Sequence, residues 1–158
     1  MFKRMANSQN ENLSLAIRQM IGTCYSGLLA TRVNQKNAPE SQNNLYATVN
    51  LISAVGEGWA EKAYENQVAP NIDLVETISE YQRLLMSVNI FSKNFDPTTN
   101  FHPFDYLQYF KVWMQLQDGA DLLTTAGLGL LNPGNVRDLS AIEETTWEHR
   151  AQMDVELS

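Results

Sequence analysis

Residues 146–157, Thr-Trp-Glu-His-Arg-Ala-Gln-Met-Asp-Val-Glu-Leu, carry the most regular pattern in the chain. Apolar residues and one histidine occupy every second position, and polar or charged residues occupy the positions between them. A period of two is that of a β-strand, and one dry face opposite one charged face is typical of an antiparallel sheet. The segment therefore predicts a half-buried antiparallel strand, which needs a second layer to cover its apolar face.

That second layer is expected to be helical. Residues 11–29 repeat apolar side chains at steps of three and four, which predicts an amphipathic helix. Pro103 favours the first position of another helix, because its fixed φ suits that position and its missing N–H is not needed there. A short helix follows, with Asp118 as its predicted N-cap and Gly127 as its left-handed stop.

Three other segments predict strands. Residues 46–53 alternate apolar and polar positions. Residues 72–91 also alternate and contain no Gly or Pro, so we predict one long strand rather than two strands joined by a tight turn. Residues 128–131 predict a short strand, and the turn signal Asn132-Pro-Gly-Asn135 follows it.

Together these elements predict an α+β fold with a mainly antiparallel sheet and helices packed on one face. No internal repeat or shift in composition divides the chain, so residues 1–158 are expected to form one domain. Residues 1–10 are expected to be flexible. The polar segments 34–44 and 57–71 are expected to be loops or hairpin arms.

Composition narrows the function classes. The chain has 158 residues, of which 44% are hydrophobic, and this excludes a wholly disordered protein. A net charge of −7 does not fit a protein that grips nucleic acid through a broad basic surface. No apolar run approaches the length of a membrane span. One cysteine and two histidines cannot build an internal disulfide or a multi-Cys/His zinc site.

No residue pattern predicts catalysis. Cys24 lies on the apolar stripe of the first predicted helix, which favours a buried small side chain over a nucleophile. Gly56-Glu-Gly58 lacks the third glycine and the following helix of a dinucleotide-binding loop. Glu143 and Glu144 could pair as the acids of a hydrolase, but such doublets are common on solvated surfaces. We therefore expect no catalytic residue, no cofactor and no metal.

The two histidines are also expected to be structural. His149 occupies one of the alternate positions that carry apolar residues in the last strand, two residues after Trp147. Because no Ser, Cys or second His is patterned nearby, a core-edge or interface role is favoured over catalysis. His102 precedes Pro103, and we expect it to help the chain enter the helix.

Three stretches in a fixed order resemble a known family. They are Asn34–Pro39 followed by Tyr46–Leu51; Glu76–Arg83 leading into Ser87–Phe91; and Gly127–Leu130, Val136–Ser140 and Glu148–Asp154. Together they resemble the neck or tail-terminator proteins of contractile-tailed bacteriophages. The resemblance spans residues 13–157, whereas residues 1–10 and 57–71 match nothing specific to that family.

The resemblance implies a virion structural protein without catalytic residues. Its subunits would form a ring, usually of six copies, that stops growth of the tail tube and sheath and presents a docking face to the head connector. The expected partners are therefore other copies of the chain, tail tube and sheath proteins, and neck proteins of the head. The expected location is the neck of the virion, and the host cytoplasm during assembly.

The resemblance also indicates candidate structural or inter-subunit residues, at positions that recur in the family: Arg137, Asp138, Arg150 and Asp154. A separate candidate is the apolar helix that carries Phe110, Trp113 and Met114. It has more large side chains than one face of a small domain needs. Its extra face is either an interface, where aromatic residues and Met concentrate, or simple core packing.

The excess of acidic residues agrees with a ring through which DNA passes without specific binding, because like charge lets the strand slide. Asp154 and Glu156 are candidates for such a lumen, although they could equally face outward. Other functions stay open at this point: another head-completion or connector protein of the neck, a small cytosolic adaptor, or an acid-dependent hydrolase.

Overall fold

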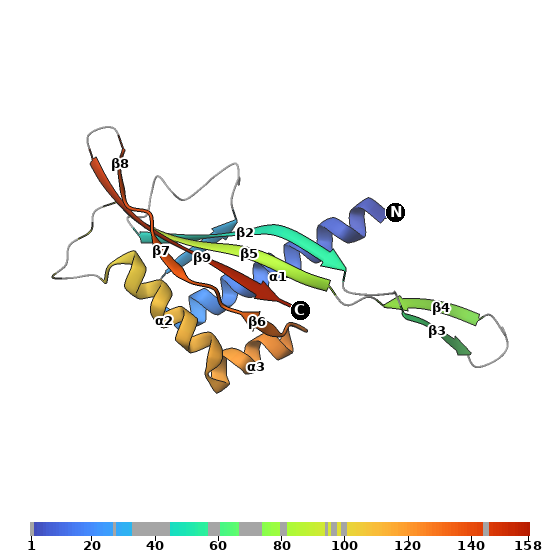
Figure 1. The fold of residues 1–158 in the computed structure, drawn as a ribbon. Helices are drawn as coiled ribbons and strands as arrows, with labels where there is room; N and C mark the ends of the chain where they lie inside the picture. The colour runs from blue at the N-terminus through green and yellow to red at the C-terminus, as the bar shows by residue number, and fades with distance from the viewer. Residues whose placement is uncertain are drawn as a thin grey trace.

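The protein is described from a computed structural model, which covers residues 2–26, 28–32, 45–56, 61–66, 74–79, 82–93, 95, 98, 101–143 and 146–158. It has an α+β fold, as predicted (Figure 1). Its elements, in chain order, are α1 (Phe2–Cys24), β1 (Leu29–Arg32), β2 (Leu45–Gly56), β3 (Glu61–Asn66), β4 (Leu74–Ser79), β5 (Gln82–Ser92), α2 (Pro103–Gln115), α3 (Gln117–Thr125), β6 (Leu130–Asn132), β7 (Val136–Asp138), β8 (Ala141–Glu143) and β9 (Thr146–Leu157).

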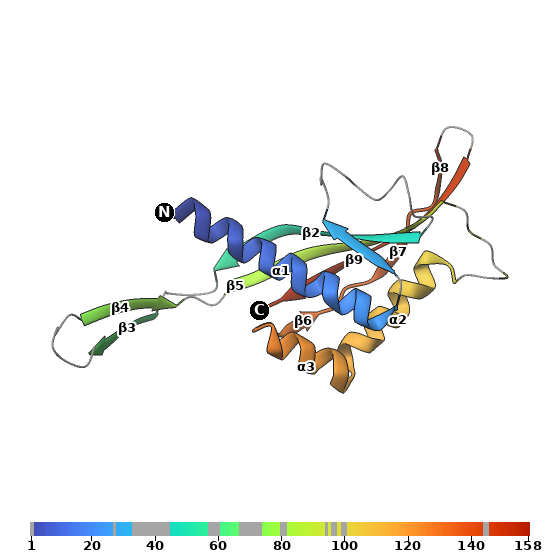
Figure 2. The ribbon, with the colours of Figure 1, turned by 180° about the vertical axis from the view of Figure 1, so that it is seen from behind.

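The main sheet is built around β2, β5 and β9, which pair antiparallel in that order. β1 pairs parallel with β2 at one edge. At the other edge the short strands β6, β7 and β8 follow one another along β9 (Figure 2). β9 is therefore an inner strand, and its alternation follows from the packing of only one of its two faces into the core.

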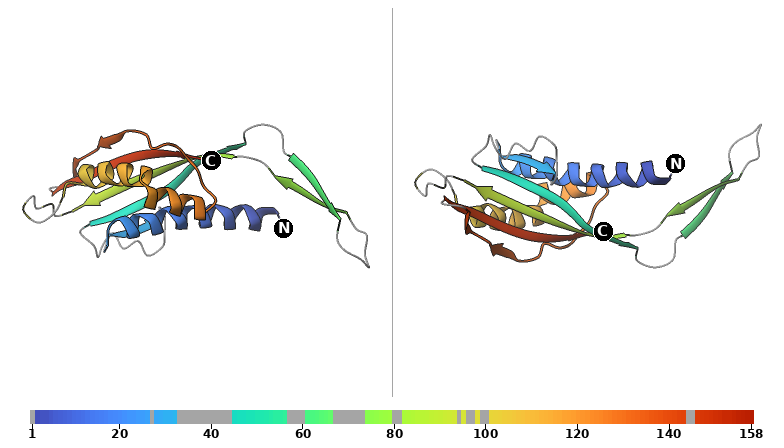
Figure 3. Two further views of the ribbon diagram at one scale, coloured as in Figure 1. Left: turned by 90° about the horizontal axis from the view of Figure 1, so that it is seen from below. Right: turned by 90° about the horizontal axis from the view of Figure 1, so that it is seen from above.

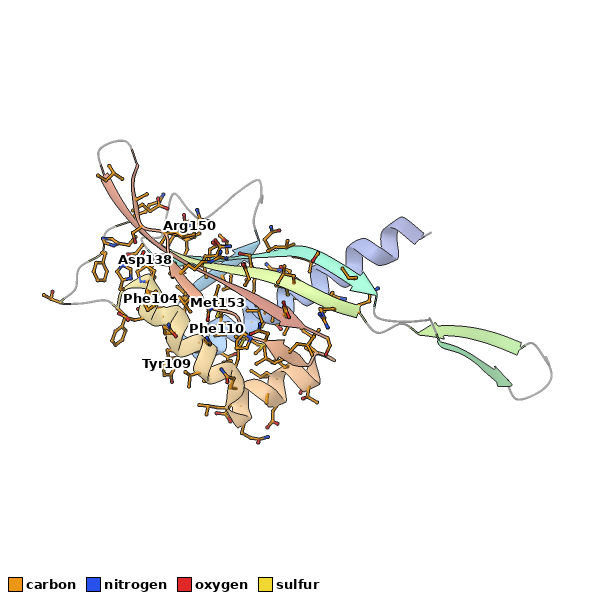
Figure 4. The ribbon with its side chains drawn as sticks, in the orientation of Figure 1. Phe104, Tyr109, Phe110, Asp138, Arg150 and Met153 are labelled. Carbon is orange, nitrogen blue, oxygen red and sulfur yellow. The ribbon has the colours of Figure 1, made fainter. Side chains whose placement is uncertain are left out.

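The helices lie on one face of this sheet, as predicted (Figure 3). The alternation in β9 is confirmed from residue 151 onward, where Ala151, Met153, Val155 and Leu157 are at most 1% exposed. Figure 4 shows Met153 and Phe110 close together between the sheet and α2. The side chains of residues 146 and 147, including the predicted apolar Trp147, lie outside the described part.

The first helix both begins and ends earlier in the chain than predicted. The pattern indicated residues 11–29, whereas α1 begins at Phe2 and ends at Cys24. Ile17 and Ile21 are buried, as the apolar spacing requires. Leu28 is also buried, but it lies beyond the helix. After the helix ends, Tyr25 donates a hydrogen bond of 2.6 Å to the carbonyl of Tyr106 and so ties this end of α1 to α2.

The start of α2 is as predicted, and the start of α3 is not. Pro103 occupies the first turn of α2, and the His102 ring accepts the N–H of Phe104. Asp118 is not the cap of α3, because Leu116 occupies that position and makes no side-chain cap hydrogen bond. The two helices also approach closely at this corner, where a side chain at Gly119 would collide with the backbone of Trp113.

The end of α3 confirms the predicted glycine stop. Gly127 has φ +73°. The N–H of Gly127 bonds to the carbonyl of Thr124, and the N–H of Leu128 bonds to the carbonyl of Leu123. These two bonds form a Schellman motif, which satisfies the last carbonyls of the helix and needs a left-handed residue.

The predicted turn after the next strand is confirmed. Gly134 has φ +63°, and its N–H donates to Asn132 Oδ1 at 3.0 Å. The strand before it, β6, begins at Leu130, two residues later than predicted. The three-residue strands β7 and β8 were not predicted, because a segment that short cannot show alternation.

The prediction of one strand over residues 72–91 is wrong. β4 ends at Ser79 and pairs with β3 in a separate two-stranded sheet, whereas β5 begins at Gln82 and pairs with β2 and β9. Four residues separate β2 from β3, but only two separate β4 from β5. Because these connections differ in length, the pairing of β2 with β5 cannot continue in the same register into the pairing of β3 with β4. Of the predicted loops or arms, 57–71 includes strand β3, and 34–44 lies outside the described residues.

Candidate functional site

The helix-free face of the sheet carries a hydrogen-bonded set of polar side chains, which we call the polar face network. Its members on the inner strands are two successive cross-strand pairs on this face of β5 and β9. Asn89 lies opposite Gln152, and Ser87 lies opposite Asp154. Gln152 Nε2 donates to Ser87 Oγ at 2.9 Å and to Asp154 Oδ1 at 3.2 Å. Ser87 Oγ also accepts from Asn89 Nδ2 at 3.3 Å.

Arg150 extends the polar face network toward β2. Its Nη2 donates to Asn89 Oδ1 at 3.0 Å, and its guanidinium carbon lies 5.0 Å from the centre of the Phe91 ring. That ring stacks on Tyr46 with a centroid distance of 4.9 Å. Among the described residues the buried Nε of Arg150 has no hydrogen-bond partner, so the guanidinium is held by one hydrogen bond and by cation–π attraction.

Arg137 closes the polar face network at the other edge of the sheet. Its Nη2 forms an ion pair of 2.5 Å with Asp154 Oδ2, across the β7–β9 pair. The side chains of Arg137 and Asp154 are 55% and 31% exposed. The charge of Asp154, a candidate for an acidic lumen, is thus compensated within the subunit.

Asp138, the fourth position indicated by the sequence, lies in a different cluster. Its Oδ1 accepts from both the N–H and the Oγ of Ser140, at 3.0 and 2.6 Å. These hydrogen bonds lower the pKa of Asp138. Ser140 Oγ also accepts the backbone N–H of Arg150 at 3.2 Å, which connects Asp138 to the polar face network through one hydroxyl.

The two histidines, which the sequence treats as separate, meet beside Asp138. His102 Nε2 lies 3.2 Å from His149 Nδ1, and the two rings are nearly perpendicular. The Phe95 ring packs against both of them. The expectation that no second histidine lies near His149 is therefore wrong, because the fold brings together residues that are 47 positions apart.

The hydrogen bonds assign the proton positions of this pair. His102 Nδ1 accepts the Phe104 N–H, so the proton of a neutral His102 is on Nε2 and points at His149 Nδ1. His149 must then be unprotonated at Nδ1. Burial lowers the pKa of His149, and the neighbouring His102 lowers it further, while Asp138 opposes the shift. Both rings are thus arranged as neutral partners in a hydrogen bond.

The other enzyme candidates gain little from the structure. Burial raises the pKa of the Cys24 thiol to about 11, which leaves it protonated and a weak nucleophile. The Ser140 hydroxyl donates to Asp138 rather than to a histidine. In the described part of the chain, no group of three or more potential ligands could hold a metal ion. The side chain of Glu143 and all of Glu144 lie outside the described residues.

The apolar helix α2 divides into a buried side and an exposed side. Phe110 and Met114 are each 1% exposed and belong to the core. Trp113 is half-buried and stacks on Phe110 at 6.1 Å. The exposed apolar side chains are different ones, Tyr109 and Val112 on α2 and Leu116 in the corner, each more than half exposed. Figure 4 shows Tyr109 on the outer side of the helix.

The polar face network thus consists of side chains that bind one another on the helix-free face, whereas the exposed apolar side chains lie on the outer side of α2, across the sheet. Large apolar side chains on a surface can mark a site of interaction with another protein. Residues 11–158 match the family described as phage neck terminator protein. The chain belongs to this family and is a structural protein of the phage neck, located in the virion. The resemblance to phage neck and tail-terminator proteins is thus confirmed, and the contractile tail stays a prediction.

The family match begins at residue 11 and includes residues 57–71, in which the sequence showed nothing specific to the family. No curated protein is similar enough to this chain to count as a match. Among the helices of the described residues, none is both long enough and apolar enough to cross a membrane.

Proposed function

We propose that six copies of this protein form a ring at the head–tail joint of a contractile-tailed phage. The ring stops growth of the tail tube and sheath and docks the tail to the head connector. The observation that carries the proposal is the family match over residues 11–158. Its partners in this function are other copies of the chain, tail tube and sheath proteins, and the connector proteins of the head.

The subunit surface supports assembly. Tyr109, Val112 and Leu116 expose large apolar side chains at spacings of three and four residues, on α2 and its corner with α3. Burial of such side chains between subunits is favourable by roughly 25 cal/mol for each Å² removed from water. A monomer in solution would leave this area exposed to water.

DNA passes through the lumen of the proposed ring without specific binding. The net charge of −7 supports this, because six copies give a strongly acidic assembly that repels phosphates. The acidic character does not come from the polar face network, since Arg137 compensates Asp154 there.

The mass of the assembly tests the proposal. Six copies of the 17.9 kDa chain give about 107 kDa in light scattering on a sizing column. The same measurement is made after mixing with tails purified from particles that lack this protein, because a tail can template the ring. A ring of six, alone or on the tail end, is the expected result. A mass of twelve subunits would indicate a connector component instead. A monomer that also fails to bind tails would refute the proposal.

A further inference from the structure

The histidine pair lies at a junction of the fold. His102 is the N-cap of α2, and His149 lies on β9, an inner strand of the main sheet. Two hydrogen bonds hold the junction. One joins His102 Nε2 to His149 Nδ1 at 3.2 Å, and the other runs from the Phe104 N–H to His102 Nδ1 at 3.1 Å. The start of α2 is therefore connected to the sheet through the His102 ring.

These two hydrogen bonds are compatible only with an uncharged pair. Two neutral rings carry two protons on four nitrogens, which leaves His102 Nδ1 and His149 Nδ1 as acceptors. One added proton leaves a single acceptor on the two rings. If that acceptor is one of the facing nitrogens, His102 Nδ1 is protonated and cannot accept the Phe104 N–H. If it is His102 Nδ1, both facing nitrogens carry protons and repel each other.

The bond that is lost is the cap. A hydrogen bond donated by a charged imidazolium is stronger than one between neutral rings, so the bond between the two histidines is retained. The added proton then lies on His102 Nδ1 and places a positive charge at the start of α2, where the helix macrodipole is also positive. The loss of the cap and the repulsion both favour opening of the first turn.

Asp138 influences how readily the pair takes up the proton. Burial and the neighbouring His102 lower the pKa of His149, and Asp138 opposes this shift. Figure 4 shows Asp138 at the end of the molecule where α2 begins, near Phe104. The other described charged residues next to these groups are Lys93 before Phe95, Asp105 in the first turn of α2, Arg137 on β7, and Glu148 and Arg150 on β9. Asp138 is thus the acid that compensates a positive charge on the pair.

The first turn of α2 also carries contacts to other parts of the subunit. The N–H groups of Asp105 and Tyr106 both bond to the carbonyl of His102. The Tyr106 ring packs edge-on against Phe101, which is 69% exposed, and the Tyr106 carbonyl accepts the Tyr25 hydroxyl. An opened first turn would therefore move an exposed aromatic side chain and weaken the connection between α1 and α2.

We propose that the histidine pair is a proton-operated latch for the start of α2. The neutral rings cap the helix and hold it on β9. One added proton uncaps the first turn while the rest of the subunit stays folded, so the surface around Phe101 changes at acid pH. The latch operates within one subunit and is independent of the ring of the proposed function.

Hydrogen exchange of the Phe104 amide measures the latch in the full protein. From pH 7.5 to pH 5, the protection of this amide should fall by about fivefold beyond the intrinsic pH dependence of exchange, because the first turn loses its cap acceptor. Amides of β5, which is paired on both sides, should keep their protection. Spectra of the protein with 15N-labelled histidine should show His102 protonated on Nε2 alone at pH 7.5 and on both nitrogens at pH 5.

Three variants distinguish the latch from a merely structural role. His102→Asn keeps a cap acceptor that does not titrate, so the Phe104 amide should stay protected at both pH values. His102→Ala removes the cap, so protection should already be low at pH 7.5. Asp138→Asn keeps the oxygen that accepts from Ser140 but removes the carboxylate charge, so the midpoint of the fall should move to lower pH.

The remaining outcomes overturn the latch. It is refuted if the protection of Phe104 does not change with pH, if it falls equally in His102→Asn, or if the β5 amides lose protection in parallel, which would mean global unfolding. A His102 ring protonated on Nδ1 at pH 7.5 would refute it as well, and an unchanged midpoint in Asp138→Asn would refute the role of Asp138. Circular dichroism checks that each variant is folded. If His102→Ala does not fold, the comparison of the unmodified protein with His102→Asn still decides.

Discussion

The two faces of β5 and β9 are held by different forces. On the helix-covered face, Met86, Val88 and Met153 are fully buried, and packing under α1 and α2 excludes water. On the other face, the side chains of the polar face network are tied to one another by hydrogen bonds and one ion pair. The same two strands thus form part of an apolar core on one face and a hydrogen-bonded polar layer on the other, in which Ser87 and Asn89 are buried. The core is expected to determine stability, and the polar face is expected to determine how the subunit fits its surroundings.

The strongest test of this comparison removes a side chain from the core. Phe110→Ala should destabilise the subunit by about 3–5 kcal/mol, because the change loses apolar burial and leaves a cavity under the sheet. Urea unfolding followed by circular dichroism measures the difference. Val112→Ala, on the exposed side of the same helix, is the control and should change stability by less than about 0.5 kcal/mol.

A smaller loss is expected from the centre of the polar face network. Arg150→Glu removes the hydrogen bond to Asn89 and places a carboxylate against the Phe91 ring and an amide oxygen. We expect a loss of about 1–3 kcal/mol in stability and disrupted ring closure, with no catalytic defect. Virions that carry the change should fail in tail length or head joining. Normal tails and normal joining would show that this face has no role in assembly.

The edge of the polar face network should matter less. Arg137→Ala breaks an exposed ion pair, so we expect a loss of about 0.2–1 kcal/mol that shrinks at high salt. A double-mutant cycle with Asp154→Ala measures the pair itself. A loss as large as that of Arg150→Glu would mean that the network acts as one unit and that the edge is not separable from the centre.

The smallest effect concerns the histidine pair at the edge of the core. The pKa of His149 is lowered below 6.5 in the folded protein, so the folded state favours the neutral ring. Stability is then full above pH 6.5 and declines as the pH falls through the folded pKa, where the unfolded chain binds the proton more readily. Urea midpoints between pH 7.5 and 5 measure this decline. His149→Gln should remove it, and an unchanged slope in that variant would assign the decline to other groups.

Local signals in the sequence predicted much of the fold. The alternation of β9, the start of α2 at Pro103 and the stop at Gly127 are all confirmed, because each depends on residues within a few positions of one another. The start of α3 was missed because the residue at its cap position, Leu116, makes no side-chain cap hydrogen bond and so gives no cap signal in the sequence. Arg137, Arg150 and Asp154, which the resemblance indicated, do lie in the polar face network, and their role between subunits stays a prediction. Asn89 and Gln152 carry no signal in the sequence except that they are polar residues at alternate positions of a strand.

The sequence by itself determined the α+β class, the dry face of the last strand, the acidic balance and the phage neck family, because these follow from composition, short-range periodicity and motif order. Only the tertiary structure decided that His102 meets His149, that Arg150 meets Asn89, and that the β3–β4 hairpin is separate from β5. Such contacts depend on the register of the strands and on the lengths of the connections between them. These quantities belong to the folded chain as a whole, and no window of the sequence contains them.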